Sequence, residues 1–144
     1  TNITCNGAEK GIFVRGVPEM HIQNVNIENA VLQADEGIDI QEATGINLKN
    51  INIITKNSNP LVYVLNSDKI RLDNVKYKDS ADVLLQVQGD RSREILFINS
   101  NVDGAKKKIT ADFGATEAMV SWAEATEPVK PAKKKKKEKV KTGK

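Results

Sequence analysis

The sequence predicts an all-β fold in which one chain winds into a solenoid of about four to five coils. The first observation is that short β-prone segments recur every 22–26 residues, with turn formers between them. The second is that no heptad or long helical stripe is present, and the third is an asparagine at one place in each repeat. A β-sandwich is the alternative, but its hairpins give no reason for a fixed period.

The asparagine-bearing segment of each repeat alternates apolar and polar residues, as a half-buried strand requires. The residue two places before each internal asparagine is apolar. Four copies are MHIQNVNIENA (20–30), INLKNINIITK (46–56), IRLDNVKYKDS (70–80) and ILFINSNVDGA (95–105). With the segment that opens the chain, the asparagines are Asn2, Asn24, Asn50, Asn74 and Asn99.

Stacking gives these asparagines a purpose, because equivalent residues of successive coils lie about 4.8 Å apart. Side-chain amides at that spacing can hydrogen bond from coil to coil. Asparagine also tolerates left-handed backbone angles, which suit a bend between two strands. We therefore expect the five asparagines to form one ladder. The same alignment puts Cys5 at the inward position of Ile27, which predicts a buried, inert thiol.

A second strand precedes each asparagine segment. Its last branched residue lies ten positions before the asparagine in three repeats, and twelve before it in the fourth, where two residues are inserted. The four strands are GIFVRG (11–16), GIDIQE (37–42), LVYVLN (61–66) and LLQVQG (84–89). Gly, Pro, Asn and Asp residues stand between the strands, as turns require.

The chain divides into three predicted parts. Residues 1–105 form the coils, residues 106–127 form a last strand and a cap that carries Trp122, and residues 128–144 form a disordered lysine-rich tail. The net charge of +3 combines a tail of +8 with a body of −5. No cap precedes the first coil, which predicts that the chain is the C-terminal piece of a longer β-helix.

Composition excludes several classes of protein. One cysteine allows no intrachain disulfide and no cysteine-based metal cluster. No apolar run approaches the roughly 20 residues of a membrane span, and no signal-like region opens the sequence. The lysine tail could contact an anionic polymer, or it could be a solvated terminus. The acidic body argues against a nucleic-acid partner, and no cofactor is predicted.

The residues from Thr1 to about Ala118 resemble the C-terminal coils of polygalacturonase-like enzymes, glycoside hydrolase family 28. The pectin-degrading members of gut Bacteroides-type bacteria share the likeness in particular. The words that carry it are GAEK (7–10), RGVPEM (15–20) and GIDIQEA (37–43). The resemblance implies a right-handed parallel β-helix, a pectin-lyase-like solenoid, in a secreted or periplasmic bacterial enzyme that hydrolyses pectin.

The resemblance implies no catalytic residue in this chain. The family uses aspartates in Asn-Thr-Asp and Asp-Asp motifs, with Gly-His-Gly and Arg-Ile-Lys motifs beside them, and none of these is present. His21 stands in Met-His-Ile, and Arg71 stands in Ile-Arg-Leu-Asp, which lacks the lysine. In the family those motifs precede the region matched here. We therefore expect this segment to have a structural role in a pectin-degrading hydrolase. The hydrolase would contact the polysaccharide through its N-terminal part, which lies outside this segment.

Some residues invite a functional interpretation beside a simpler one. Lys10 and Arg15 are candidates for binding a galacturonate carboxylate, or are exposed strand positions. His21 is expected to be a surface histidine rather than a general base. Asp35, Glu36 and Asp39 are too few for a calcium site and are expected in a solvated turn. Trp122 is expected to plug the open core rather than stack on a sugar.

The competing function comes from a different class of protein. It is a non-catalytic solenoid that binds a polysaccharide or another protein, with the lysine tail as an electrostatic anchor. A parent reading frame with Asp-Asp and Gly-His-Gly upstream favours the hydrolase, and its absence favours the binding module. The sequon Asn2-Ile3-Thr4 carries little meaning in a bacterial protein.

Overall fold

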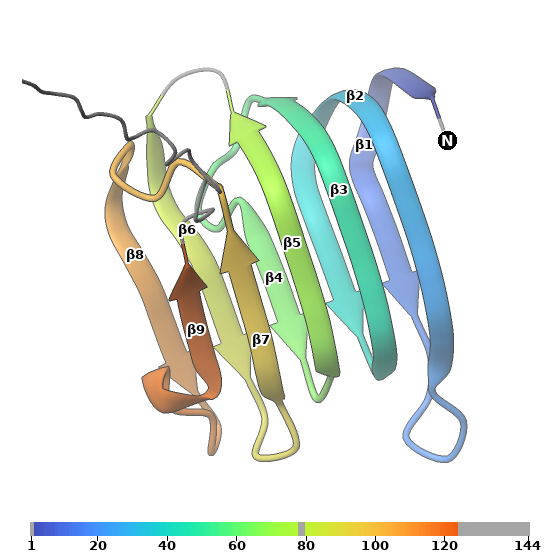
Figure 1. Cartoon of the computed structure of the whole chain (residues 1–144), viewed down its shortest axis with the longest axis vertical. Helices are drawn as coiled ribbons and strands as arrows, with labels where there is room; N and C mark the ends of the chain where they lie inside the picture. Colours follow the sequence, from blue (N-terminus) through green and yellow to red (C-terminus); the bar gives the residue numbers. More distant parts are fainter. Residues whose placement is uncertain (1, 78–79, 124–144) are drawn as a thin grey trace, which may run out of the picture.

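The structure is a computed structural model that describes residues 2–77 and 80–123. Its described part is built almost entirely of β-strands (Figure 1). They are β1 (Ile3–Arg15), β2 (Ile22–Gln41), β3 (Ala43–Thr55), β4 (Val62–Leu65), β5 (Asp68–Tyr77), β6 (Ala81–Gln88), β7 (Arg93–Ile98), β8 (Ala105–Asp112) and β9 (Val120–Ala123). A single 3-10 turn, η1 (Glu117–Met119), precedes β9.

Every pairing between named strands is parallel, and each strand pairs with the one that follows it by a full coil. The order is β8-β6-β4-β2-β3-β5-β7-β9, with β1 paired to β2 beside this path. Figure 1 shows the strands running side by side as the chain progresses from one end of the stack to the other. The all-β parallel solenoid of about five turns is therefore confirmed.

Like residues stack over like inside the coils, and these inward columns form the core. One column is closed by an aromatic pair, because the rings of Phe97 and Trp122 lie 5.0 Å apart between centroids. Its members are Ile27, Leu48, Leu72, Phe97 and Trp122. Leu48 and Leu72 are completely buried in the middle of the stack. Branched and aromatic side chains suit this pleated interior, which explains why the segments are strands.

The coils bend at columns of residues with left-handed backbone angles. One of these columns consists of asparagines with φ between 54° and 59°, namely Asn2, Asn29, Asn50, Asn74 and Asn99. The register fixes its members, because Ala30 pairs with Ile51, and Ile51 with Val75. The Nδ2 of Asn74 donates to Oδ1 of Asn50 at 2.8 Å, and that of Asn50 to Oδ1 of Asn29 at 2.9 Å. The Nδ2 of Asn99 donates instead to Oδ1 of Asp73 at 3.1 Å.

Asn24 is not in this ladder, and the prediction was wrong at that position. Asn24 lies one column away, beside Gly45, because Gln23 pairs with Thr44 and Val25 with Ile46. The two corners are five residues apart in every coil, since Asn24, Gly45, Lys69 and Glu94 also have positive φ. The words Ile-Gln-Asn and Ile-Glu-Asn both fit the repeat, so the first copy was aligned on the wrong corner.

The same shift of five residues corrects two related expectations. Ile27, and not Ile22, is the counterpart of Leu48, while Ile22 pairs with Ala43. Cys5 pairs with Leu32 instead of the position of Ile27, and it is half-buried at the open end of the core.

The final segment continues the solenoid. β8 pairs with β6, and β9 adds a rung to β7, so that Val120 lies beside Ile95 and Trp122 beside Phe97. The predicted tail of residues 128–144 lies outside the described residues. Among the described residues no helix has the length and apolar character that a membrane crossing requires.

Candidate functional site

A small pocket opens on the outer face of the first coils, where β1, β2 and β4 lie side by side. Its volume is about 170 Å³, and its lining combines charged, amide and aromatic side chains. The lining residues are Lys10, Glu36, Gly37, Ile38, Asp39, Asn57, Asn59, Pro60 and Tyr63. Two of the segments on which the predicted resemblance rests, GAEK and GIDIQEA, meet here, because the Nζ of Lys10 lies 3.1 Å from Oδ2 of Asp39.

Lys10 lies between two carboxylates. Its Nζ contacts Oε1 of Glu36 and lies 3.1 Å from Oδ2 of Asp39. The hydrogen bond to Glu36 is the main cause that raises the pKa of Lys10, burial opposes it, and Asp39 adds to the rise. The ammonium also lies 5.7 Å from the ring centroid of Phe13. Lys10 is therefore neutralised by its own neighbours, so its charge is not free for an anionic sugar.

Asp39 organises the floor of the pocket. The side chain of Gln41 donates to Oδ1 of Asp39 at 2.8 Å, and the residue is 8% exposed. Burial, followed by the charge of Asp39, raises the pKa of Tyr63, and the Tyr63 hydroxyl donates to Oε1 of Gln88 at 2.8 Å. The register of the strands stacks four residues in one column on the outer face of successive coils, namely Phe13, Asp39, Tyr63 and Gln86.

Arg15 stands at the end of the same strand, where β1 pairs with Gln41 of β2. It is exposed, and no carboxylate of residues 2–77 or 80–123 forms an ion pair with it. The two predicted binding residues therefore share a strand but differ in state: Lys10 is engaged, and Arg15 is available.

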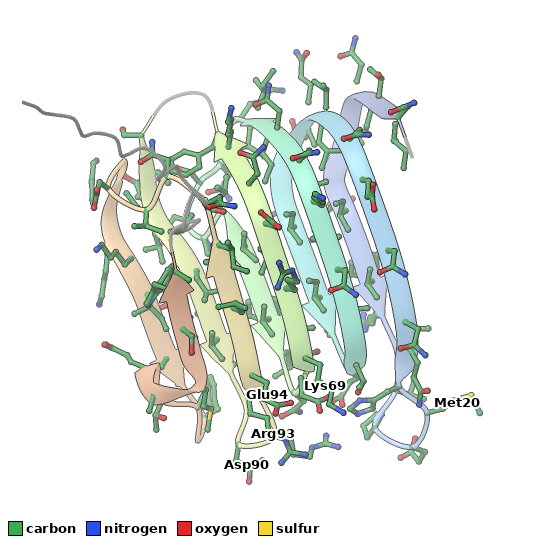
Figure 2. The ribbon with its side chains drawn as sticks, viewed as in Figure 1. Met20, Lys69, Asp90, Arg93 and Glu94 are labelled. Atoms are coloured by element: carbon green, nitrogen blue, oxygen red, sulfur yellow. The ribbon has the colours of Figure 1, made fainter. Side chains whose placement is uncertain are left out.

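A second polar cluster lies at the bend between β2 and β3, and no local pattern in the sequence predicted it. Its centre is Glu42, a buried carboxylate with φ 49° at a third corner. The Nδ2 of Asn66 donates to Oε1 of Glu42 at 3.0 Å, and NH2 of Arg91 lies 3.2 Å from Oε2. The Nε2 of His21 lies 3.3 Å from the same oxygen. Figure 2 shows Lys69, Asp90, Arg93 and Glu94 near one another at the lower edge of the view, with Met20 apart from them on the right.

His21 is half-buried in this cluster rather than a free surface residue, so that expectation was wrong. Its Nδ1 lies 3.1 Å from Oγ1 of Thr44, and that hydroxyl donates to Oδ1 of Asp68 at 2.7 Å. The Thr44 proton is therefore committed to Asp68, so His21 has no hydroxyl nucleophile to activate. The cluster joins successive coils.

The acidic residues of the first turns do not converge on one point. Asp35 pairs with Lys56 at 3.0 Å, while Glu36 and Asp39 both face Lys10. Within the described ranges, no three His, Cys, Asp or Glu side chains are placed to hold a metal ion.

The C-terminal end of the core has a larger hollow than the pocket at Lys10. It measures about 500 Å³ and contains Trp122, which is 37% exposed, together with Phe97 and the polar side chains of Asn101, Asp103 and Lys108. Trp122 continues the inward column, so its ring covers Phe97 rather than facing away from the solenoid.

Comparisons with models of protein families, with curated proteins and with solved structures found no match to this chain. What the described residues establish is therefore the β-solenoid architecture and the geometry of its surfaces.

Proposed function

We propose that this chain is the structural and polysaccharide-contacting β-helical part of a pectin-degrading glycoside hydrolase of the polygalacturonase type. The observation that carries the proposal is the small pocket on β1, β2 and β4, which together with the outward side chains beside it is called the groove below. Separate segments of the predicted resemblance meet in this pocket at Lys10 and Asp39. A secreted or periplasmic location belongs to the same proposal, because pectin lies outside the cell.

The groove has the chemistry that a sugar polymer requires. Phe13 is 52% exposed and Tyr63 lines the pocket, so two aromatic rings stand in one column and offer apolar faces to sugar rings. Gln41 and Gln88 supply amides nearby. The guanidinium of Arg15 is suited to a uronate carboxylate because its fork matches two oxygens at once.

The groove lacks the means to break a glycosidic bond. Hydrolysis with inversion uses an acid and a base carboxyl about 6.5–9.5 Å apart, with room for water between them. Glu36 and Asp39 both contact the ammonium of Lys10, which lies between them in the place that a water molecule would need. Bond cleavage in the proposed enzyme would belong to residues outside this segment.

The test is affinity electrophoresis or calorimetry of the full chain with polygalacturonate. We expect binding that weakens about 5–10-fold in Arg15→Ala, since one charge-assisted bidentate contact is lost. Arg93→Ala is the matched control, because Arg93 is also an exposed arginine but lies at the start of β7, on a later coil. A reducing-sugar assay should stay at the blank. Equal binding by both variants, or no binding at all, would refute the proposal.

One observation favours a second candidate, a non-catalytic solenoid that binds a neutral polysaccharide. The pocket itself carries one lysine against two carboxylates, which gives an anionic polymer no net attraction there. Tighter binding to a neutral galactan than to polygalacturonate would select this candidate. A protein partner is a further possibility for the same class of solenoid.

A further inference from the structure

Lys10 contacts two carboxylates that differ in how firmly they are fixed. The side chain of Asp39 is 12% exposed, and its Oδ1 accepts a hydrogen bond from the side chain of Gln41 at 2.8 Å. The side chain of Glu36 is 46% exposed, and among residues 2–77 and 80–123 its carboxylate contacts Lys10 alone. Asp39 is therefore built into the wall of the pocket, whereas Glu36 is held by a single contact.

That single contact contributes little to stability. The side chains of Lys10 and Glu36 are both partly exposed, so water screens the ion pair, and two long side chains lose rotamer freedom to form it. The pKa of Lys10 is raised mainly by the hydrogen bond to Glu36, against the effect of burial, and Asp39 raises it as well. Lys10 therefore remains an ammonium, with Asp39 beside it, when Glu36 moves away.

We infer that Glu36 is an internal competitor at a carboxylate-binding site, where its side chain occupies Lys10 until the carboxylate of a uronate sugar replaces it. The existing contact already joins an ammonium and a carboxylate, so the ligand group meets the same donor in the same place. The pocket, of about 170 Å³, has the volume of several water molecules, which is room for one carboxylate and part of a sugar ring. That the ligand is a uronate rests on the proposed function.

The rest of the lining suits a sugar ring of either kind. Asn57 and Asn59 bring side-chain amides to the pocket, and Tyr63 brings an aromatic ring. Amides exchange hydrogen bonds with hydroxyl groups, and an aromatic ring packs against the apolar face of a sugar. A neutral sugar uses these groups without displacing Glu36, whereas a uronate must displace it to reach Lys10. Glu36 therefore sets the preference of the pocket between acidic and neutral polymers.

The test compares Glu36→Gln with the parent chain by calorimetry, against polygalacturonate and against a neutral galactan. Glutamine has nearly the same size as glutamate but carries no charge to hold Lys10. We expect Glu36→Gln to bind polygalacturonate about 2–5-fold more tightly, which is the range that a partly exposed ion pair can withhold. The affinity for the neutral galactan should not change.

Glu9→Gln is the matched control, because it removes the same charge one residue away from Lys10. Glu9 is an exposed glutamate of β1, and in the described ranges it forms no ion pair. If net charge alone repels the polymer, Glu9→Gln and Glu36→Gln gain affinity equally. We expect the gain in Glu36→Gln only.

Lys10→Gln tests whether the gain passes through Lys10. Added to Glu36→Gln, it should return the affinity for polygalacturonate to that of the parent chain or below. In the parent chain it should have a smaller effect, because Glu36 already occupies Lys10. Glutamine can still donate to Asp39, so the buried carboxylate keeps a partner. Circular dichroism checks that each variant is folded, and the comparison of Glu36→Gln with Glu9→Gln decides the question if Lys10→Gln is not.

Three results would overturn the inference: equal affinities of Glu36→Gln and Glu9→Gln for polygalacturonate, a gain that survives Lys10→Gln, or an equal gain for the neutral galactan. Any of these, together with weaker binding by Arg15→Ala, would remove the inference and leave the proposed function in place. The expected gain in Glu36→Gln, together with equal binding by Arg15→Ala and Arg93→Ala, would do the reverse. No binding of polygalacturonate by Glu36→Gln or the parent chain would overturn both.

Discussion

At the scale of single residues, the corners of the coils show how much backbone preference can be overridden by stacking. Asparagine is suited to a left-handed corner, and five asparagines occupy one such column. The neighbouring column holds Lys69, φ 56°, and Glu94, φ 52°, which gain nothing from that conformation. A non-glycine residue there costs about 1–2 kcal/mol, so these two corners are held by the stacked strands on either side.

Lys69→Asn should therefore stabilise the protein by about 0.5–1 kcal/mol, because the replacement prefers the backbone angles that the fold imposes. Lys69 is exposed near the start of β5 (Figure 2), so its replacement removes little packing. Urea unfolding followed by circular dichroism measures the change. Lys76→Asn is the control, since Lys76 is an exposed lysine within β5 outside these corners, and it should not stabilise. A lower midpoint for Lys69→Asn would contradict this account.

The titrating residues of the groove predict a loss of stability at high pH. The pKa values of Lys10 and Tyr63 are both raised, the first mainly by the hydrogen bond to Glu36 and the second mainly by burial. The folded state thus holds both protons more tightly than the unfolded state. Their contribution is complete below about pH 10 and is lost as the pH rises through the folded pKa values.

We expect the urea midpoint to be level between about pH 8 and 9.5 and to fall above about pH 10. Tyr63→Phe should make the fall shallower, because phenylalanine has no phenol proton to lose as the pH rises. Since Tyr77 shares a raised pKa, caused chiefly by burial, Tyr77→Phe is a parallel test away from the groove. A slope that is the same in all three proteins would exclude these residues as the cause.

At the scale of elements, the sequence predicted the strands better than their register. Period, alternation and turn residues were enough to place both strands of each repeat, because those signals are local. The first coil was misaligned because Asn24 and Asn29 both follow an Ile-x motif, and no local signal distinguishes two left-handed corners. Only the pairing of β2 with β3 decides between them.

The Glu42 cluster escaped prediction for a related reason. Its partners His21, Asn66 and Arg91 are separated by tens of residues, and only the stacking of coils brings them together. In the sequence each residue is an ordinary polar residue near a turn. Lys10 and Arg15 stay predicted binding residues. The contacts of Lys10 with Glu36 and Asp39 escaped prediction, because they depend on the neighbouring coil.

Glu42 should couple energetically to Arg91 across two coils. Glu42→Gln is expected to lower the free energy of unfolding by about 1–3 kcal/mol, because the buried side chain loses the charge that pairs with Arg91. The effect of Arg91 alone is smaller, since its side chain is 48% exposed. A double-mutant cycle with Arg91→Gln should give a coupling of about 0.5–1.5 kcal/mol.

Glu94→Gln is the matched control for this cycle. Glu94 is an exposed glutamate near the same end of the molecule, so its replacement should change stability by less than about 0.5 kcal/mol. Additive effects of Glu42→Gln and Arg91→Gln would show that the contact contributes nothing to folding.

At the scale of the whole molecule, the solenoid has no central core that all elements share. Each coil contacts the coil before it and the coil after it, so stability is a sum of neighbour terms along one axis. β3 and β5 are paired on both sides, whereas β1 has β2 alone among the described residues. The first coil is therefore expected to open without the rest.

Hydrogen exchange measures this gradient directly. We expect the hydrogen-bonded amides of β1 to exchange at least about tenfold faster than those of β5, which corresponds to about 1.4 kcal/mol of extra local stability at the centre. Leu72→Ala, at a fully buried position of β5, should erase much of the difference by weakening the centre about 2–5 kcal/mol. Ile3→Ala, at a partly exposed position, should leave β5 unchanged because the loss stays in the first coil. Equal protection of β1 and β5 would instead mean that the coils open together as one cooperative unit.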